Sequence, residues 1–440
     1  MKKIQLTFVF LIIALTGLWL LAEGILTTTF DTFASWRLLL YYSGIIGIGV
    51  MSVGMILAVR PVFIEPYLGG LDKMYRLHKW LGITGLSFAI VHWLSTQAPR
   101  WTSVSSVPPV REAEPVQTVV IFQYLQDLSG LGKVLGEWAF YAAVILIVLA
   151  LVKYFPYRYF FKTHRILAVV YLFLVFHSVV LMKFTYWTEI IGPVMAILMI
   201  AGTAAAFISL FRRIGANRRA VGVIEEIVRH PGIRVIEIVT MLKSKWSGHQ
   251  AGQFAFVTFD QSEGPHPFTI TSAWKGDGSL RLIVKELGDY TNTLPTTLTV
   301  GDAFELEGPY GQFNFRGNEP RQIWVGGGIG ISAFVARMKT LADQPDGKII
   351  DLFHTTTVFD EGGIAKLRSD AKAAHVRLHV LVDSKDGLLN AERIHQAIPD
   401  WKSATVWFCG PAGFGQALHR DFTAGGLSSS DFHQELFDIR

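Results

Sequence analysis

Four histidines stand inside long apolar stretches of this 440-residue chain, and their spacing suits metal chemistry. His78 and His92 are 14 residues apart, and His164 and His177 are 13 apart. Four helical turns take about 14.4 residues, so each pair lies near one helix face and spans roughly 20 Å. Two helices would then offer two cross-helix imidazole pairs at two depths. Neutral imidazole is a good ligand for haem iron, so the pattern predicts two stacked bis-histidine haems.

Two other interpretations of these histidines stay open. They could be hydrogen-bonded polar residues inside a bundle, although ionisable residues at membrane depth are functional candidates by default. They could also bind a non-haem metal, but a separation of roughly 20 Å argues against one four-ligand site. If two haems bind, Phe88 and Tyr171 are candidate aromatic stepping stones by position alone.

A second set of residues suits a flavin. His266-Pro267-Phe268-Thr269 combines an aromatic ring, which could pack on the flavin, with a hydroxyl that could approach its N5, while His266 could approach the pyrophosphate. The segment from Lys285 to Thr291 adds a cation, a glycine turn and a second hydroxyl, and Gly308-Pro309-Tyr310-Gly311 adds a tight turn. Each piece alone could be ordinary turn chemistry. Their order along the chain favours a flavin site.

A third set suits a nicotinamide nucleotide. The glycines of Val325–Ser332 follow an apolar strand and precede a helix, where a backbone can approach a pyrophosphate at the helix N-terminus. Cys409-Gly410-Pro411 ends the last expected strand, and ligands of open α/β sheets bind beyond the carboxyl ends of the strands. Cys409 could equally be a small buried residue, and we do not expect it to be a nucleophile.

The elements that must position these residues divide into two halves. Residues 1 to about 211 contain six apolar runs that we interpret as membrane-spanning helices: 6–22, 38–59, 78–95, 138–152, 164–182 and 190–211. The first run could instead be a signal peptide, but Leu20–Glu23 lacks a good cleavage site, so we expect a retained helix. Such a composition, 51% hydrophobic and 17% charged, excludes a disordered chain and an ordinary soluble domain.

The distribution of charge and the cysteine content indicate the membrane topology and exclude several kinds of metal site. Lys and Arg cluster beside the apolar runs, which indicates membrane topology rather than nucleic-acid binding, and the positive-inside rule places the N-terminus and everything after residue 211 in the cytoplasm. His78 and His164 then form the inner pair, and His92 and His177 the outer pair. The single cysteine excludes a disulfide framework and a cysteine-ligated zinc or iron–sulfur site.

The pattern changes from about residue 217. Alternating segments at 222–228, 235–240, 254–259 and 280–284 predict half-buried strands, and Gly and Pro between them favour a small antiparallel barrel. After about 320, strands alternate with helices, which predicts a parallel sheet of βαβ units. The expected strands are 322–325, 349–353, 377–382 and 404–408, and the expected helices are 331–342, 361–374, 390–397 and 413–423.

At this point the chain resembles the NADPH oxidase and ferric reductase superfamily of transmembrane flavocytochromes b. The resemblance rests on the two histidine spacings, the His266–Thr269 and Lys285–Thr291 motifs, the glycine loop and Cys409-Gly410-Pro411, in the family's order. It implies a six-helix haem bundle over 1–214, an FAD-binding antiparallel β-barrel over 217–317 and an NAD(P)-binding α/β domain over 318–440. The cytosolic half is similar to the ferredoxin–NADP reductase fold.

The resemblance also implies roles for single residues. His78 and His164 would ligate the inner haem b, and His92 and His177 the outer one. Phe437 would cover the flavin and move aside for nicotinamide. The expected FAD contacts are His266, Pro267, Phe268, Thr269, Lys285 and Thr291, and the expected nucleotide contacts are Gly328, Gly330, Ser332, Cys409, Gly410 and Pro411. Phe437, Cys409 and Thr269 would stand nearest the reacting atoms.

The expected activity is electron transfer from cytosolic NADPH or NADH, through FAD and two haems, to an acceptor on the outer face of a bacterial inner membrane. Dioxygen, giving superoxide, is the first expectation, and a ferric chelate is the alternative. A third possibility is a membrane redox subunit that passes electrons to a partner protein or quinone. Where NADPH-preferring relatives often carry arginine, residues 351–357 offer threonines, so NADPH preference is not expected.

Overall fold

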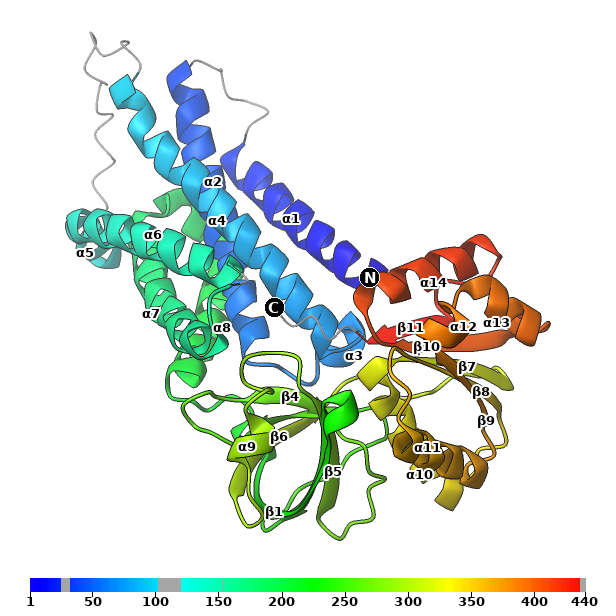
Figure 1. Cartoon of the computed structure of the whole chain (residues 1–440). Helices are drawn as coiled ribbons and strands as arrows, with labels where there is room; N and C mark the ends of the chain where they lie inside the picture. The colour runs from blue at the N-terminus through cyan, green and yellow to red at the C-terminus, as the bar shows by residue number, and fades with distance from the viewer. Residues whose placement is uncertain (25–31, 102–119, 153, 436–440) are drawn as a thin grey trace. The chain divides into compact units, whose positions relative to one another are not determined.

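The computed structural model describes residues 1–24, 32–101, 120–152 and 154–435 (Figure 1). These residues form two compact units, one of helices and one that contains both β-sheets. The helical unit comprises residues 1–68 and 73–214, and the second unit comprises 69–72 and the chain from 215 onward. Phe437 lies outside the described residues.

Six long helices make up most of the first unit. They are α1 (Lys2–Glu23), α2 (Thr32–Ala58), α4 (Leu71–Trp101), α6 (Ser129–Leu151), α7 (Tyr157–Leu181) and α8 (Ile191–Leu210). Shorter segments lie between them: α3 (Glu65–Leu68), α5 (Val120–Asp127) and η2 (Phe184–Thr188). Helix α6 packs along α7, and α2 packs along α8.

Five helical segments among the described residues are long and apolar enough to cross a membrane. They are Lys2–Glu23, Ser35–Ala58, Ser129–Leu151, Tyr157–Leu181 and Ile191–Leu210. The remaining expected run, 78–95, is helical but lies in α4, which does not qualify by the same measure of length and composition. His78, Lys79 and His92 lower the hydropathy of α4, so the residues that suggest chemistry also weaken its membrane signal. Six spans therefore stay a prediction.

Helix α1 is an integral part of the helical unit. Ile4 and Leu15 are buried, and Trp19 packs its ring against Tyr42 at 4.9 Å. At the end of α1, the Glu23 carboxylate pairs with Lys183 Nζ at 3.0 Å. These contacts join α1 to α2 and to the segment between α7 and α8.

The first sheet of the second unit is antiparallel, as expected. Its strand order is β4-β3-β6-β1-β2-β5, and a single bridge between Ile270 and Leu282 joins the two edges. Alternate residues of β5 point into a buried apolar core, which also holds Phe268 and Phe304. The strands are β1 (Arg219–His230), β2 (Val235–Leu242), β3 (Phe254–Thr258), β4 (His266–Thr269), β5 (Ser279–Lys285) and β6 (Ala303–Tyr310), with the short α9 (Leu294–Thr297) before β6.

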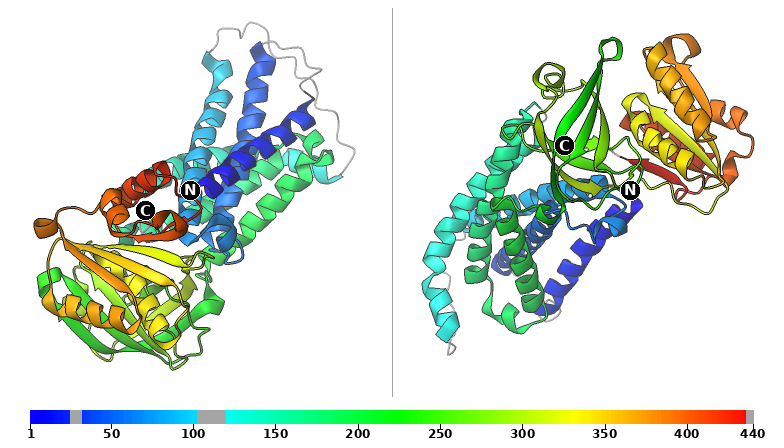
Figure 2. Two further views of the ribbon diagram at one scale, coloured as in Figure 1. Left: turned by 90° about the vertical axis from the view of Figure 1, so that its right-hand side faces the viewer. Right: turned by 90° about the horizontal axis from the view of Figure 1, so that it is seen from below.

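The second sheet is parallel, with strand order β11-β10-β7-β8-β9. Helices cover both of its faces (Figure 2). Helices α10 (Ile331–Asp343) and α11 (Glu361–Ala373) pack on one face, and α13 (Ala391–Ala397) and α14 (Ala412–Ala424) on the other. The strands are β7 (Arg321–Gly327), β8 (Ile349–Thr356), β9 (Arg377–Val382), β10 (Ala404–Cys409) and β11 (Phe432–Glu435). Strand β11 was not expected from the sequence.

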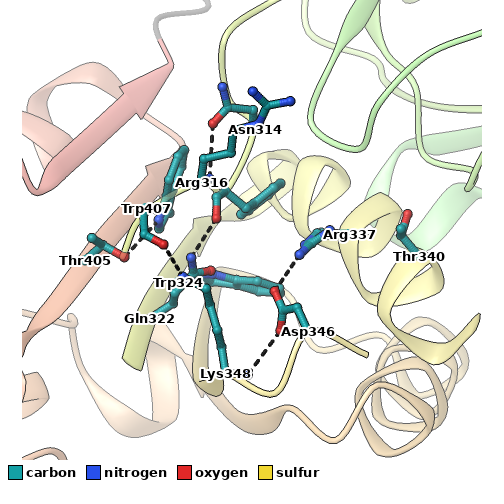
Figure 3. A network of polar contacts seen from close by, with 12 residues as sticks. Asn314, Arg316, Gln322, Trp324, Arg337, Thr340, Asp346, Lys348, Thr405 and Trp407 are labelled. Atoms are coloured by element: carbon teal, nitrogen blue, oxygen red, sulfur yellow. Dashed lines mark hydrogen bonds and ion pairs between the residues drawn. The ribbon is translucent and has the colours of Figure 1, made fainter. Parts of the chain in front are cut away.

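A buried polar network fixes the chain where it passes from the first sheet to the second (Figure 3). Gln322 donates from Nε2 to the Phe315 carbonyl at 2.7 Å and accepts from Trp324 Nε1 at 2.9 Å. Lys348 Nζ donates to the Gly317 carbonyl at 2.6 Å. Buried polar groups are costly unless they are hydrogen-bonded, so these paired contacts specify one path for the connection.

The buried carboxylate of Asp351 allows a test of which interactions stabilise the parallel sheet. Asp351 on β8 is 1% exposed and accepts from Arg321 Nη1 at 2.7 Å and from Arg377 Nη2 at 2.9 Å. We predict that Asp351→Ala lowers the free energy of unfolding by about 3 kcal/mol, because it removes the buried acceptor that two guanidinium groups share. Thermal unfolding of the full chain in detergent, followed by tryptophan fluorescence, measures the loss.

The matched control is Asp400→Ala. Asp400 also pairs with Arg321, at 3.0 Å, but its side chain is 58% exposed, so its loss should cost less than about 1 kcal/mol. Equal melting temperatures for the two variants would contradict the assignment.

Candidate functional sites

The two expected histidine pairs meet across α4 and α7. The ring centroids of His78 and His164 are 5.9 Å apart, and those of His92 and His177 are 6.1 Å apart. A metal–imidazole bond is about 2 Å long, so two such bonds in line, with half of each ring added, separate the centroids by about 6 Å. Each pair is therefore spaced to ligate one metal ion from opposite sides.

Backbone carbonyls orient three of the four imidazoles. His78 Nδ1 donates to the Gly54 carbonyl at 2.9 Å, and His92 Nδ1 donates to the Leu40 carbonyl at 3.0 Å, both on α2. His177 Nδ1 donates to the Gly132 carbonyl of α6 at 2.9 Å. A carbonyl can only accept, so Nδ1 carries the hydrogen and Nε2 is left bare. This is the arrangement in which a protein fixes the tautomer of a metal-binding histidine.

Two glycines give the outer pair its space. A Cβ built on Gly136 of α6 would lie 2.0 Å from His177 Nδ1, and one on Gly44 of α2 would lie 3.2 Å from His92 Cε1. Sequence reasoning missed both glycines and the carbonyls of Leu40, Gly54 and Gly132. Small residues in apolar helices were the available signal, since they mark close helix approach.

His164 differs from the other three histidines. Its Nδ1 is buried, and it has no hydrogen-bond partner among the described residues. Its ring stacks on Phe160, one helical turn earlier, with centroids 4.9 Å apart and an interplanar angle of 25°. The four histidines thus share a facing geometry but not the same surroundings.

These residues fit a haem at each pair. The porphyrin supplies four ligands to its iron, so the protein needs to provide only two axial ones, and a bare Nε2 on opposite helices suits that role. In the part of the chain that the structure describes, no group of three or more His, Cys, Asp or Glu side chains could hold a metal ion.

The two candidate stepping stones have different surroundings. Tyr171 is buried, and its hydroxyl lies 2.8 Å from Ser52 Oγ, in space that Gly202 leaves open. Phe88 packs against Tyr42 at 5.8 Å. Both contacts are also those of ordinary packing, so a relay role stays a prediction.

The expected flavin motif forms edge strand β4. Thr269 and Phe268 are buried, and Phe268 belongs to the apolar core of the antiparallel sheet. His266 stacks on Tyr290 with centroids 4.3 Å apart. Burial lowers the pKa of His266 to about 4, so this imidazole is neutral at pH 7 and offers a hydrogen bond rather than a charge to a pyrophosphate.

Thr291 stabilises the turn that follows β5. Thr291 Oγ1 accepts from the backbone N–H groups of Leu287 and Gly288 at 3.0 and 3.1 Å. Lys285 ends β5 opposite Val235 of β2. The hydroxyl that the sequence suggested as a cofactor contact therefore also holds the turn that carries this motif.

The two expected nucleotide loops touch each other. They follow β7 and β10, which are neighbours at the point where the strand order reverses direction, and this is where open α/β sheets bind ligands. A Cβ on Gly330 would lie 2.1 Å from the Cys409 carbonyl oxygen, and one on Gly327 would lie 2.9 Å from Pro411 Cδ. Gly328 has φ +54 and open space around it. Ser332 is buried at the start of α10 and donates to the Ile329 carbonyl at 2.8 Å.

Cys409 is fully buried, as an inert thiol would be. Burial, with a contribution from the charge of Glu435, raises the pKa of this thiol well above its ordinary value, which excludes a thiolate nucleophile at pH 7. Glu435 is 4% exposed and lies beside Cys409 in the β10–β11 pairing. Sequence reasoning missed Glu435, because β11 has only four residues and three of them are polar.

Comparisons with known families identify the chain. Residues 43–175 match the family described as ferric reductase like transmembrane component, and residues 228–314 match an FAD-binding domain family. An integral membrane component joined to a flavin domain is the architecture of the NADPH oxidase and ferric reductase superfamily. The chain therefore has the domain architecture of that superfamily, and its two matched domains are those of an oxidoreductase.

The curated relatives match between 24% and 39% of this chain. The flavohemoprotein of Oceanobacillus iheyensis is 24% identical over 162 residues, which is 34% of this chain and 40% of that protein. The phenol hydroxylase P5 protein of Acinetobacter pittii is 32% identical over 107 residues, 24% of this chain and 30% of that protein. The NADPH oxidoreductase of Mycobacterium tuberculosis is 27% identical over 184 residues, 39% of this chain and 47% of that protein. The chain thus spans less than half the length of these relatives.

Solved structures give weaker likenesses. The Amycolatopsis cytochrome P450 reductase GcoB has a TM-score of 0.44 at 21% identity, covering 50% of this chain and 70% of that one. A flavohemoglobin from Malassezia yamatoensis with bound FAD and heme has a TM-score of 0.47 at 17% identity, covering 92% of this chain and 97% of that one.

The glycine beside His177 gives a test of the outer pair. We predict that Gly136→Ala displaces His177 and lowers the haem bound per chain, because its Cβ would lie 2.0 Å from Nδ1. The control is Gly130→Ala on the same helix, where nothing lies within 4 Å, and it should keep the wild-type haem content. Pyridine haemochrome analysis measures both variants, and equal haem content would refute the placement.

The contact between the two nucleotide loops gives a second test. We predict that Gly330→Ala separates the loops and raises the KM for NADH and NADPH by roughly tenfold, or about 1.4 kcal/mol. The control is Gly362→Ala in α11, which meets no atom within 4 Å and should keep the wild-type KM. Initial rates of nucleotide oxidation measure both, and an unchanged KM in Gly330→Ala would remove the loop from the binding site.

Proposed function

We propose that this protein is a transmembrane NAD(P)H oxidoreductase that moves electrons from cytosolic nucleotide to an acceptor on the outer face of a bacterial inner membrane. The observation that carries the proposal is the facing of His78 with His164 and of His92 with His177, at centroid distances of 5.9 and 6.1 Å. Two such pairs on α4 and α7, 13 to 14 residues apart, provide two redox sites at two depths.

The proposed cofactors are FAD, two haems b and NADPH or NADH. When bound, FAD would accept two electrons as a hydride from the nucleotide and release them one at a time to the haems, which carry single electrons. The proposed domains are 1–214 for the haems, 217–317 for FAD and 318–440 for the nucleotide, with both termini in the cytoplasm. The Lys and Arg clusters beside the apolar runs support this orientation.

For the residues of the soluble half, the proposal keeps the roles that the resemblance implies. Thr269 and Phe268 stand at the flavin, with His266, Pro267, Lys285 and Thr291 around it. Cys409, Gly410 and Pro411 face the glycine loop across the expected nicotinamide crevice, and the contact of Gly330 with the Cys409 carbonyl supports this placement. Phe437 is proposed to cover the flavin.

We propose that NADH is accepted at least as well as NADPH. At the end of β8, Thr356 donates to the Val358 carbonyl at 2.9 Å, and His354 donates to the Gly326 carbonyl. Burial lowers the pKa of His354, so this histidine is neutral. A 2′-phosphate would then meet hydroxyls here, without the fixed charge of a guanidinium.

The proposed acceptor is dioxygen, with superoxide as the product, on the resemblance to NADPH oxidases. A ferric chelate is the second candidate, and the match of residues 43–175 to a ferric reductase like transmembrane component favours it. Donation to a partner protein or a quinone is a further alternative. These three outcomes differ in which acceptor reoxidises the reduced protein.

The first experiment uses the purified full chain in detergent with FAD. Under anaerobic conditions, NADH or NADPH should give the reduced spectrum of two bis-histidine haems per chain. Rapid reoxidation by air with superoxide release would support the oxidase, whereas slow reoxidation by air and rapid reoxidation by a ferric chelate would support the reductase. A chain that binds no haem would overturn the proposal.

A single substitution then locates the outer site. We predict that His92→Ala removes the outer haem and abolishes acceptor reduction, while NADH still reduces the flavin, because the flavin motifs lie in the other unit. Haem content, flavin absorbance and acceptor turnover are measured on the same preparation. Unchanged haem content and turnover would refute the assignment of His92.

A further inference from the structure

Glu237 is a buried carboxylate on the outer face of the antiparallel sheet. Side chains alternate along a strand, and Ile236 and Ile238 of β2 belong to the apolar core, so Glu237 between them points away from that core. Glu237 is nevertheless only 5% exposed. Both of its carboxylate oxygens accept from Lys366 Nζ at 2.9 Å, and Lys366 belongs to α11, which packs on the parallel sheet. Glu237 therefore joins the two sheets of the second unit.

The second partner of Glu237 is Arg281 on β5, whose guanidinium forms an ion pair with the same carboxylate. The backbone of Arg281 is bonded to the segment that follows the expected flavin motif. Its carbonyl accepts from the Thr271 N–H at 2.8 Å and from Thr271 Oγ1 at 2.9 Å, and its N–H donates to Ser272 Oγ at 3.2 Å. Thr271 stands two residues after Thr269, so Arg281 links the flavin motif to Glu237.

The same connection leads to the expected nucleotide loop. Helix α11 packs against α10, which begins at Ile331 directly after the 3-10 turn η5 (Gly328–Gly330). Turn η5 also lies beside β5, the strand that carries Arg281. Strand β5 is thus held to the flavin motif by its backbone and to the helices of the parallel sheet by the ion pairs of Glu237.

Hydride transfer requires the two reacting groups to lie about 3–3.5 Å apart, and a small misplacement costs much of the rate. In the proposed function, the flavin lies on the antiparallel sheet and the nicotinamide on the parallel sheet, so the spacing between the sheets limits the reaction. We infer that Glu237, Arg281 and Lys366 are positioning residues that set this spacing. The inference rests on the proposed function, since it requires FAD and the nucleotide at these two sheets.

Burial explains why these ion pairs, rather than others, should set the spacing. A second pair also joins the two sheets: Lys275, in the turn before β5, lies 3.4 Å from Asp343 at the end of α10. Its two side chains are 64% and 55% exposed, and ion pairs in solvent contribute little. The Glu237 side chain is 6% exposed, and a buried carboxylate that loses a cation is destabilised strongly. Separation of the sheets is therefore opposed at Glu237.

The test is anaerobic stopped-flow reduction of the FAD-loaded full chain, in detergent, by saturating NADH. Lys366→Met keeps most of the apolar stem and removes the charge, and the half-exposed position should let the variant fold. Lys366→Met should slow flavin reduction roughly tenfold and weaken the charge-transfer absorbance between nicotinamide and flavin, because the reacting groups are displaced. The Kd for NADH should stay at the wild-type value, since the nucleotide loop itself is intact.

Lys275→Met is the matched control and should reduce its flavin at the wild-type rate. An unchanged rate in Lys366→Met, or equal losses in the two variants, would overturn the inference and leave the proposed function standing. A wild-type chain whose flavin is not reduced by NADH would overturn the proposed function instead.

A double-mutant cycle tests whether the residues act together. Glu237→Gln keeps the shape of the side chain and removes its charge, so it should also slow flavin reduction. Adding Lys366→Met to Glu237→Gln should cause no further loss, because both changes remove the same interaction. Lys366→Arg, which keeps a cation, should retain most of the wild-type rate. Additive losses in the double variant, or a rate in Lys366→Arg as low as that in Lys366→Met, would overturn the inference.

Discussion

The helical unit depends on one constraint: a hydrogen bond to the second nitrogen of an imidazole orients the ring and leaves the first nitrogen for a metal. In this protein the backbone provides that bond to three of the four histidines. Gly54 and Leu40 present carbonyls from α2 to His78 and His92 on α4, and Gly132 presents one from α6 to His177 on α7. The helices that carry none of the four histidines therefore orient three of them, and the packing of α2 and α6 shapes both pairs. The glycines at 44 and 136 follow from the same constraint, because the imidazoles lie directly against those backbones.

In the second unit, the constraint is close approach of the backbone to a ligand, and glycine loops satisfy it. A dinucleotide needs backbone N–H groups that are close to it, and close approach requires residues without side chains. The loop after β7 and the loop after β10 meet at Gly330 and the Cys409 carbonyl, at the position where the strand order reverses. Burial and the neighbouring Glu435 keep the Cys409 thiol protonated, so this residue contributes shape rather than nucleophilic chemistry.

Sequence reasoning succeeded where side-chain type and period carry the information. The spacing of His78 with His92 predicted pairs that meet across two helices. Apolar periodicity located β1, β2, β3 and β5 of the first sheet and β7 to β10 of the second, but it did not locate β4 or β6. Sequence reasoning failed where backbone atoms act, because no side chain reports that the Leu40 carbonyl will face an imidazole 52 residues away. It also missed β11, a four-residue strand that forms by pairing with β10. It overestimated the apolar character of α4, where His78 and His92 lower the mean hydropathy.

Helix α2 relates the spacing of the two histidine pairs to its own length. Its two acceptor carbonyls, at residues 40 and 54, are 14 residues apart, and the histidines that they hold, at 92 and 78, are also 14 apart in the opposite chain direction. Both imidazoles therefore fix the number of residues between 40 and 54, whereas packing constrains residue type at single positions such as Gly44. One inserted or deleted residue in this stretch would rotate one carbonyl by about 100° away from its imidazole while leaving the other in place. Among relatives of this chain, length between these two positions should therefore be under stronger selection than the identity of the residues that fill it.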